Sequence, residues 1–139
     1  MDNILEYVRE WFYYADNDYD VVTILLGHYP LKLEVICFHC QQAVEKWLKG
    51  YLAFKGVDEP PKTHNLIELC DMAVVYDEQF NTYRTQFEAL TRYAVIVRYP
   101  RESRITELDT RKAFDYATTI RAFAPLAEMR AAAFADSAV

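Results

Sequence analysis

Apolar side chains recur every three or four residues along the first half of the chain, a pattern that predicts amphipathic helices. One stripe predicts a helix over residues 3–26, with Gly27 placed to end it. A second stripe predicts a helix over residues 31–56, with Gly56 at its end. Only a short connection containing Pro30 separates the two helices, so we expect them to pack antiparallel.

Shorter helices are predicted beyond the loop around residues 58–61. Thr63 or Asn65 can cap the third helix, whose apolar positions begin at Leu66. Helical spacing then continues over residues 80–97 and predicts a fourth helix, which Pro100 would stop.

The last helix is predicted from its own start signal. Thr106 and Asp109 approximate a capping box, in which each residue satisfies the other's backbone N–H. Pro125 either kinks this helix or starts a final alanine-rich turn, and the tail after about Phe134 should fray.

These elements predict an all-α fold, an up-and-down bundle of four to five helices. A length of 139 residues indicates one domain, residues 1–139, with room for a real core. The chain has only 3 Gly and 5 Pro, too few for the frequent turns of an all-β protein.

Charge and hydropathy exclude some classes of function. A net charge of −6 argues against broad, non-specific binding of nucleic acid, although a local basic cleft is compatible with it. No apolar run approaches the roughly 18 residues of a membrane span, and the first residues lack the basic start of a signal peptide. We therefore expect a cytoplasmic protein that does not enter a membrane, with its three cysteines reduced.

Polar residues follow the second predicted helix beside its apolar stripe. His39, Gln42, Lys46 and Lys49 fall within an arc of roughly 80° at about 100° per residue. Half of this helix therefore belongs to the core and half to a polar row. His39 is a candidate proton carrier, but a hydrogen-bonded structural histidine is the commoner case.

Two stretches imitate metal sites. Cys37 and Cys40 flank a Phe-His pair, but a structural zinc site needs four ligands, and both thiols lie on the apolar stripe. Residues 16–20 resemble the opening of a calcium loop, but Val21 stands where that loop needs Gly. We expect no metal and no cofactor; the cysteines should pack in the core, and Asp16 or Asp20 should pair with a basic helix.

Cations and tyrosines gather late in the chain, where they suit phosphates and bases. The cluster consists of Arg92, Tyr93, Arg98, Tyr99, Arg101 and Arg104. Pairing with the chain's 21 acidic residues is an equally good explanation. Lys62 and His64, close to a predicted helix start, also favour an anion. No Gly-rich phosphate loop and no Ser/His/Asp pattern is present, so these residues alone indicate no reaction.

Four stretches together resemble the HEPN domains, small helical bundles named for nucleotide binding in higher eukaryotes and prokaryotes. Trp11, Ala15 and Asp18 are similar to the family's W-x-x-x-A-x-x-D pattern. Residues 38–49, FHCQQAVEKWLK, resemble its F-H-x-Q-Q-A-x-E-K-x-L-K helix. Residues 61–66, PKTHNL, resemble its K-T-H-D-L segment with Asn for Asp, and residues 98–100 match its R-Y-P. The resemblance covers roughly residues 8 to 125.

The resemblance implies a homodimer whose cleft collects the polar row and the arginines. It also implies a partner protein, because many members are encoded beside a small nucleotidyltransferase as a toxin–antitoxin pair. Some members cleave RNA without metal, using Arg followed four to six residues later by His. This chain departs from that pattern, since His28, His39 and His64 are its only histidines and none follows an arginine at that spacing.

The resulting hypothesis is a HEPN-like binding module for a nucleotide or phosphorylated ligand that partners a nucleotidyltransferase. The predicted ligand-binding residues are Lys62, His64, Arg92, Arg98, Tyr99, His39, Gln42 and Lys46. One alternative is a metal-independent toxin ribonuclease that uses His39 or His64 as proton carrier, since such cleavage needs a group titrating near neutral pH. Another alternative is a structural dimerisation domain without any ligand. Whether the protein is an enzyme is left open by its sequence.

Overall fold

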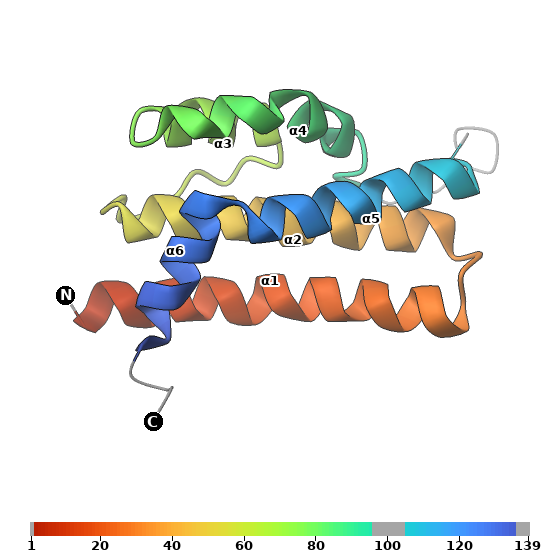
Figure 1. The fold of residues 1–139 in the computed structure, drawn as a ribbon, viewed down its shortest axis with the longest axis horizontal. Coiled ribbons are helices and arrows are strands. Elements are labelled where there is room, and N and C mark those ends of the chain that lie inside the picture. Colours follow the sequence, from red (N-terminus) through yellow and green to blue (C-terminus); the bar gives the residue numbers. More distant parts are fainter. Residues whose placement is uncertain (1, 96–104, 136–139) are drawn as a thin grey trace.

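Two long antiparallel helices form the base of the molecule (Figure 1). The computed structural model describes residues 2–95 and 105–135, and α1 (Asp2–His28) and α2 (Leu33–Phe54) are its longest elements. Helix α5 (Glu107–Ala122) lies along α2, and α6 (Ala124–Ala133) turns from the end of α5 across α1. Within the described ranges the fold contains helices and no strand, which confirms the predicted all-α bundle.

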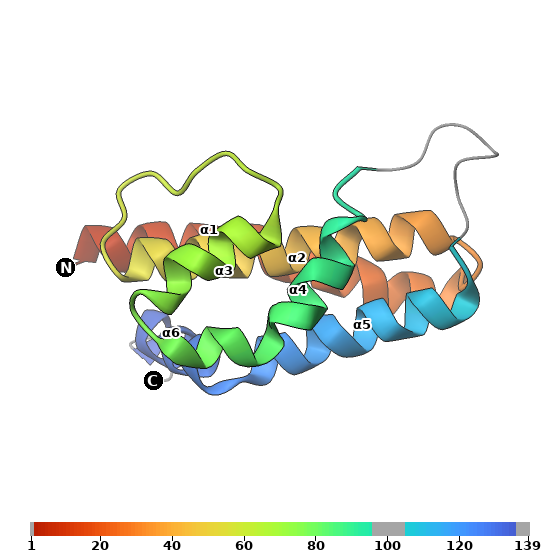
Figure 2. The same cartoon turned by 90° about the horizontal axis from the view of Figure 1, so that it is seen from above.

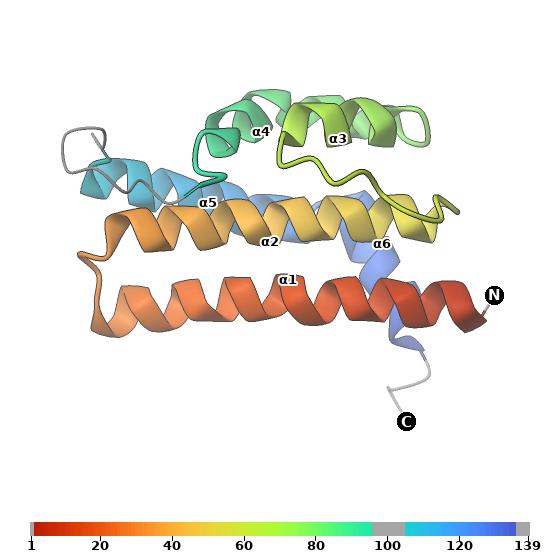
Figure 3. The same ribbon diagram turned by 180° about the vertical axis from the view of Figure 1, so that it is seen from behind.

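A second layer of shorter helices covers α2 and α5. It consists of α3 (Leu66–Val74), a 3-10 helix over Glu78–Tyr83, and α4 (Arg84–Thr91). Seen from above, α3 and α4 form a bent arm over the two longer helices (Figure 2). The opposite view shows α1 on the far side of α2 from this arm (Figure 3). Helix α2 is therefore enclosed by α1, α5 and the arm, and each of its residues is buried or half-buried.

The apolar faces of these amphipathic helices pack together to form the core. Its largest fully buried side chains include Trp47, Phe80 and Phe87. Cys37 and Cys40 are also completely buried as free thiols, which confirms that they pack in the core. Gly50 permits the close crossing of α1 and α2, because a Cβ at this position would lie 3.1 Å from Cβ of Trp11.

The acidic run at residues 16–20 lies within α1. Asp16 pairs with a cation of another helix, Arg130 of α6, but α6 also carries Glu128 and is not the basic helix that was predicted. The Asp16 carboxylate accepts two hydrogen bonds from the Arg130 guanidinium, at 2.8 and 2.9 Å. Trp47 Nε1 donates to the same carboxylate at 3.1 Å. A fork of this kind fixes both distance and orientation. Asp16 therefore ties α6 to the α1–α2 pair.

Several predicted helix ends are confirmed by their caps. Asn65 accepts a hydrogen bond from Ile67 N at the start of α3. Thr106 and Asp109 form the reciprocal capping box at the start of α5. Gly56 has a φ of +98°, the left-handed conformation expected just beyond α2. Pro125 starts α6, so the second of the two alternatives for this proline is correct.

Two predicted boundaries are wrong. Helix α1 continues through Gly27 to His28, because Tyr29 N still donates to Leu25 O at 2.7 Å; Pro30 then prevents further extension. The predicted fourth helix instead begins as the 3-10 turn at residues 78–83, and α4 ends at Thr91.

Local hydrogen bonds explain the shorter fourth helix. Thr91 Oγ1 donates to Phe87 O at 2.8 Å and accepts from Leu66 N at 3.1 Å, which links it to α3. After it, Tyr93 N and Ala94 N donate to carbonyls only three residues back, so the helix tightens and stops. The rest of this prediction, together with Pro100 and most of the predicted fraying tail, lies outside the described residues.

Among the helices that the structure describes, none combines the length and the apolar character required to span a membrane.

Candidate functional site

The polar row of α2 is joined to α1 through one carboxylate. Asp18 lies with Oδ1 2.7 Å from His39 Nδ1 and with Oδ2 2.5 Å from Lys46 Nζ. The Asp18 side chain is 11% exposed, whereas His39 and Lys46 are 25% and 23% exposed. Helical spacing explains why both side chains reach Asp18, since residues 39 and 46 are two turns apart on the face of α2 that packs against α1.

A second carboxylate holds the loop before α3 against α2. Glu45 Oε2 accepts from Lys49 Nζ at 3.1 Å, and Glu45 Oε1 lies 2.8 Å from His64 Nδ1. Gln41 Nε2 donates to Glu45 and to the backbone carbonyl of His64, at 3.2 and 2.9 Å. Gln42 Nε2 donates to Gln41 Oε1 at 2.7 Å. This chain of hydrogen bonds satisfies a carboxylate that is 5% exposed.

Each network fixes a histidine by its Nδ1 atom. A carboxylate at Nδ1 orients the ring and leaves Nε2 as the nitrogen for exchange with a ligand or solvent. His64 is the more accessible of the two, with 61% of its side chain exposed. The arrangement is able to place a proton carrier at the surface, but no reacting group lies beside it in the described contacts.

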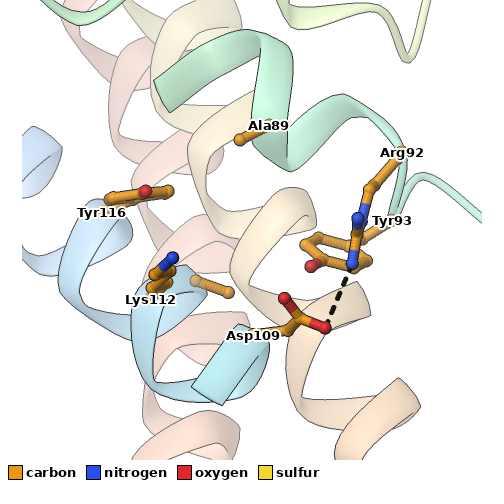
Figure 4. A pocket seen from close by; sticks show the side chains of 7 residues that line it. Ala89, Arg92, Tyr93, Asp109, Lys112 and Tyr116 are labelled. Atoms are coloured by element: carbon orange, nitrogen blue, oxygen red, sulfur yellow. Dashed lines mark ion pairs between the residues drawn. The ribbon is translucent and has the colours of Figure 1, made fainter. Parts of the chain in front are cut away.

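A surface pocket of about 190 Å³ lies between the end of α4 and the first half of α5. Figure 4 shows Arg92 and Tyr93 from the α4 side, with Asp109, Lys112 and Tyr116 from α5. The α5 residues follow a three-and-four spacing, so they share one helix face. The pocket thus combines two cations, one carboxylate and two tyrosine rings.

Arg92 is held in position by its neighbours. Its guanidinium carbon lies 4.6 Å from the centre of the Tyr93 ring, and Nη2 lies 3.4 Å from Asp109 Oδ2. The guanidinium has five donors, so these contacts leave donors for a ligand. With 56% of the side chain exposed, the group is accessible from solvent.

Protonation states in the pocket follow from burial and capping. Burial raises the pKa of Tyr93 to about 12, so its phenol stays neutral at physiological pH. The backbone N–H of Thr106 donates to Asp109 and lowers the pKa of this carboxyl below its usual 3.8. Asp109 is therefore an anion and a pure hydrogen-bond acceptor near neutral pH.

The structure distributes the predicted ligand-binding residues over separate places. His39 and Lys46 share Asp18, while His64 and Gln42 belong to the Glu45 network. Lys62 is exposed on the loop before α3. Arg92 lines the α4–α5 pocket, and Arg98 and Tyr99 lie outside the described residues. The contacts therefore join the α2 residues to acidic partners and do not join them to Arg92.

Sequence patterns did not identify the α5 side of the pocket. Asp109 was recognised only as a capping residue, Lys112 had no assigned role, and Tyr116 was expected only on the inner face of the last helix. Their spacing is a weak signal, because any exposed helix face shows it. The acidic partners Asp18 and Glu45 were present in motifs, but only tertiary contact shows what they bind.

Metal ligands do not gather in either network. Within residues 2–95 and 105–135, no group of three or more His, Cys, Asp or Glu side chains is arranged to hold a metal ion. Each carboxylate is engaged by a histidine and a lysine, and a lysine ammonium offers donors but no lone pair.

The family model described as HEPN domain matches residues 8–127. The chain belongs to the HEPN family. Three of the four HEPN-like stretches meet on α2, since Asp18 comes from the first, His39, Glu45 and Lys46 from the second, and His64 from the third. These HEPN positions thus form the two polar networks that hold α1 and the loop before α3 to the central helix.

A solved structure supports the same architecture. The crystal structure of TT1696 from Thermus thermophilus aligns with a TM-score of 0.70 and 24% sequence identity, covering 88% of this HEPN chain and 97% of TT1696. At that identity the likeness establishes the fold. No curated protein matches the sequence significantly.

Proposed function

We propose that this HEPN chain is a binding module whose α4–α5 pocket takes a nucleotide or another phosphorylated ligand. The observation that carries the proposal is the placement of Arg92 and Lys112 around a pocket walled by Tyr93 and Tyr116. Arginine forks and ammonium groups bind phosphoryl oxygens, and the partly exposed ring of Tyr116 offers a surface for a base. Among the residues that the structure describes, Arg92 is the one member of the predicted ligand-binding set that lines this pocket.

The state of Arg92 supports this assignment over simple ion pairing. A guanidinium fully committed to an internal carboxylate makes two short, parallel hydrogen bonds, as Arg130 does with Asp16 at 2.8 and 2.9 Å. The distance from Arg92 to Asp109 is longer, 3.4 Å, and more than half of the arginine side chain is exposed. Arg92 is therefore oriented by Tyr93 and Asp109 but retains donors for an anion.

We propose in addition that the protein forms a homodimer and partners a nucleotidyltransferase, in a toxin–antitoxin pair. The homodimer, the nucleotidyltransferase partner and the toxin–antitoxin role are all supported by the resemblance to the HEPN family. Arg98 and Tyr99 follow Arg92 by six and seven residues in the sequence and remain predicted ligand-binding residues.

Arg92→Ala is expected to weaken the binding of AMP about ten- to a hundredfold, because a charge-assisted hydrogen bond contributes roughly 1.5–3 kcal/mol. Titration calorimetry measures the affinity, and thermal unfolding with and without AMP supports it, since ligand at about 100 times its Kd adds roughly 2.7 kcal/mol. Arg84→Ala is the matched control, because Arg84 pairs with Asp71 away from this pocket. Equal affinities of the wild type and Arg92→Ala would refute the assignment.

A ribonuclease is the second candidate, and the His64–Glu45 pair favours it. The buried Glu45 carboxylate orients the exposed His64 ring, which is the arrangement that a proton carrier needs. If the purified protein cleaves RNA in EDTA, His64→Ala should reduce the rate about 10²- to 10⁴-fold, and His28→Ala, which alters another exposed histidine, should not. Cleavage that persists in His64→Ala would remove His64 from this role, and absence of cleavage by the wild type would leave the binding module.

A further inference from the structure

Asp109 is the unexpected member of the α4–α5 pocket. A site that served only to collect phosphate would gain affinity by omitting a carboxylate, since like charges repel. Here the carboxylate lies 3.4 Å from Arg92 Nη2 and 2.9 Å from Thr106 N, and it is 29% exposed. Thr106 and Arg92 thus hold one oxygen of the carboxylate, Oδ2, within the wall of the pocket.

Charge limits the ligand class. The described residues that line the pocket carry two positive charges, on Arg92 and Lys112, and one negative charge, on Asp109. One phosphoryl group is therefore better compensated there than a chain of three. The pocket volume of about 190 Å³ lies below the roughly 300–1,000 Å³ of pockets that enclose whole drug-sized ligands, so only part of a nucleotide fits inside it.

Hydrogen bonding adds a second requirement. An ionised carboxylate only accepts, so the ligand must offer a donor where Asp109 lies. Because Asp109 is next to the phosphate-binding guanidinium, that donor must be close to the phosphoryl group within the ligand. In a nucleotide, the ribose hydroxyls meet this condition, whereas the amino groups of the base are farther from the phosphate.

We propose that Asp109 makes the pocket selective for a ribonucleoside monophosphate, accepting from a ribose hydroxyl while Arg92 and Lys112 bind the single phosphoryl group. The inference rests on the proposed function and specifies its ligand. Asp109 discriminates between ligands in two ways. It raises the affinity for a ligand with ribose hydroxyls by accepting their hydrogen bond, and it lowers the affinity for ligands that bring only negative charge. Tyr116, which is partly exposed on the pocket wall, supplies a surface for the base.

The test compares four probes by titration calorimetry: AMP, 2′,3′-dideoxy-AMP, ATP and inorganic phosphate. The wild type should bind AMP about tenfold more tightly than the dideoxy analogue, as expected for one hydrogen bond to a charged group, and ATP no more tightly than AMP. In Asp109→Asn, that preference for AMP should fall to about twofold or less, while phosphate and ATP should bind about three- to tenfold more tightly. Asp71→Asn removes the same charge from α3, outside this pocket, and should leave the wild-type pattern unchanged.

Asp109→Asn is expected to reduce the preference for AMP over its dideoxy analogue but to strengthen the binding of phosphate and ATP. These opposite changes in affinity distinguish ligand selectivity from a structural effect. If Asp109→Asn weakens all four probes alike, Asp109 only caps α5 and positions Arg92, and the inference is overturned. The wild type alone also tests the inference, in case the variant does not fold. Equal affinities of the wild type for AMP and its dideoxy analogue would overturn the inference. If neither wild type nor Asp109→Asn binds any probe, the proposed function itself fails; if AMP binds through Arg92 without discrimination, only the inference about Asp109 fails.

Discussion

Replacing Glu45 by alanine is expected to lower the free energy of unfolding by about 3–5 kcal/mol. The side chains of Glu45 and Lys49 are 5% and 8% exposed, so removal of the carboxylate leaves a buried ammonium without its partner. His64 and Gln41 also lose an acceptor. Urea unfolding followed by circular dichroism measures the change, provided that the slope with denaturant is unchanged.

Two comparisons make the Glu45 result specific. The double variant Glu45→Leu with Lys49→Met should lose much less stability than Glu45→Ala, because it removes both buried charges together. Asp71→Ala, which breaks an exposed pair with Arg84, should cost only about 0–1 kcal/mol. A loss for Glu45→Ala as small as that for Asp71→Ala would contradict the importance of this network.

Trp47→Ala is expected to have an effect of similar size, about 3–5 kcal/mol, because it opens a large cavity at the centre of the bundle. Trp47 is 1% exposed and its ring centre lies 5.7 Å from that of Tyr19. Its Nε1 also donates to Asp16, the carboxylate that binds Arg130 of α6. Chemical denaturation followed by circular dichroism measures the loss, because its helix signal does not depend on the fluorescence of the tryptophan that is removed.

Trp47→Phe separates packing from hydrogen bonding. Phenylalanine refills most of the space but cannot donate, and Asp16 keeps its two bonds from Arg130, so a loss of about 1–2 kcal/mol is expected. If Trp47→Phe were as damaging as Trp47→Ala, the hydrogen bond to Asp16 and not the volume of the ring would dominate. α6 would then depend mainly on the polar contact.

The long helices could be predicted because their signals are local. The apolar stripe of α2 and the caps at Asn65 and Thr106 depend on residues within a few positions of one another. The end of α4 could not be predicted in this way, because Thr91 also contacts Leu66, 25 residues earlier. Gly27 was misjudged for a related reason: glycine permits a helix end but does not require one, and Pro30 ends α1 instead.

The candidate site also contains some residues that the sequence identifies and others that only tertiary contacts bring together. Arg92 was recognisable from the run of cations and tyrosines, whereas Asp109 and Lys112 joined it only when α5 packed beside α4. His39 and His64 were recognised as candidates, but the carboxylates that hold them, Asp18 and Glu45, lie 21 and 19 residues away in the sequence. A pattern of residue types carries no information about such pairings.

Taken alone, the sequence determined the all-helical class, most helix positions, the buried cysteines and the HEPN stretches, because each depends on periodicity or on short runs of residues. Tertiary structure decided which charges are neutralised and which remain available. It enclosed Glu45 and Lys49 within the bundle and left Arg92 and Lys112 at a pocket with Asp109. The physical reason is that the strength of a charge interaction depends on distance and burial, and both arise only when helices pack.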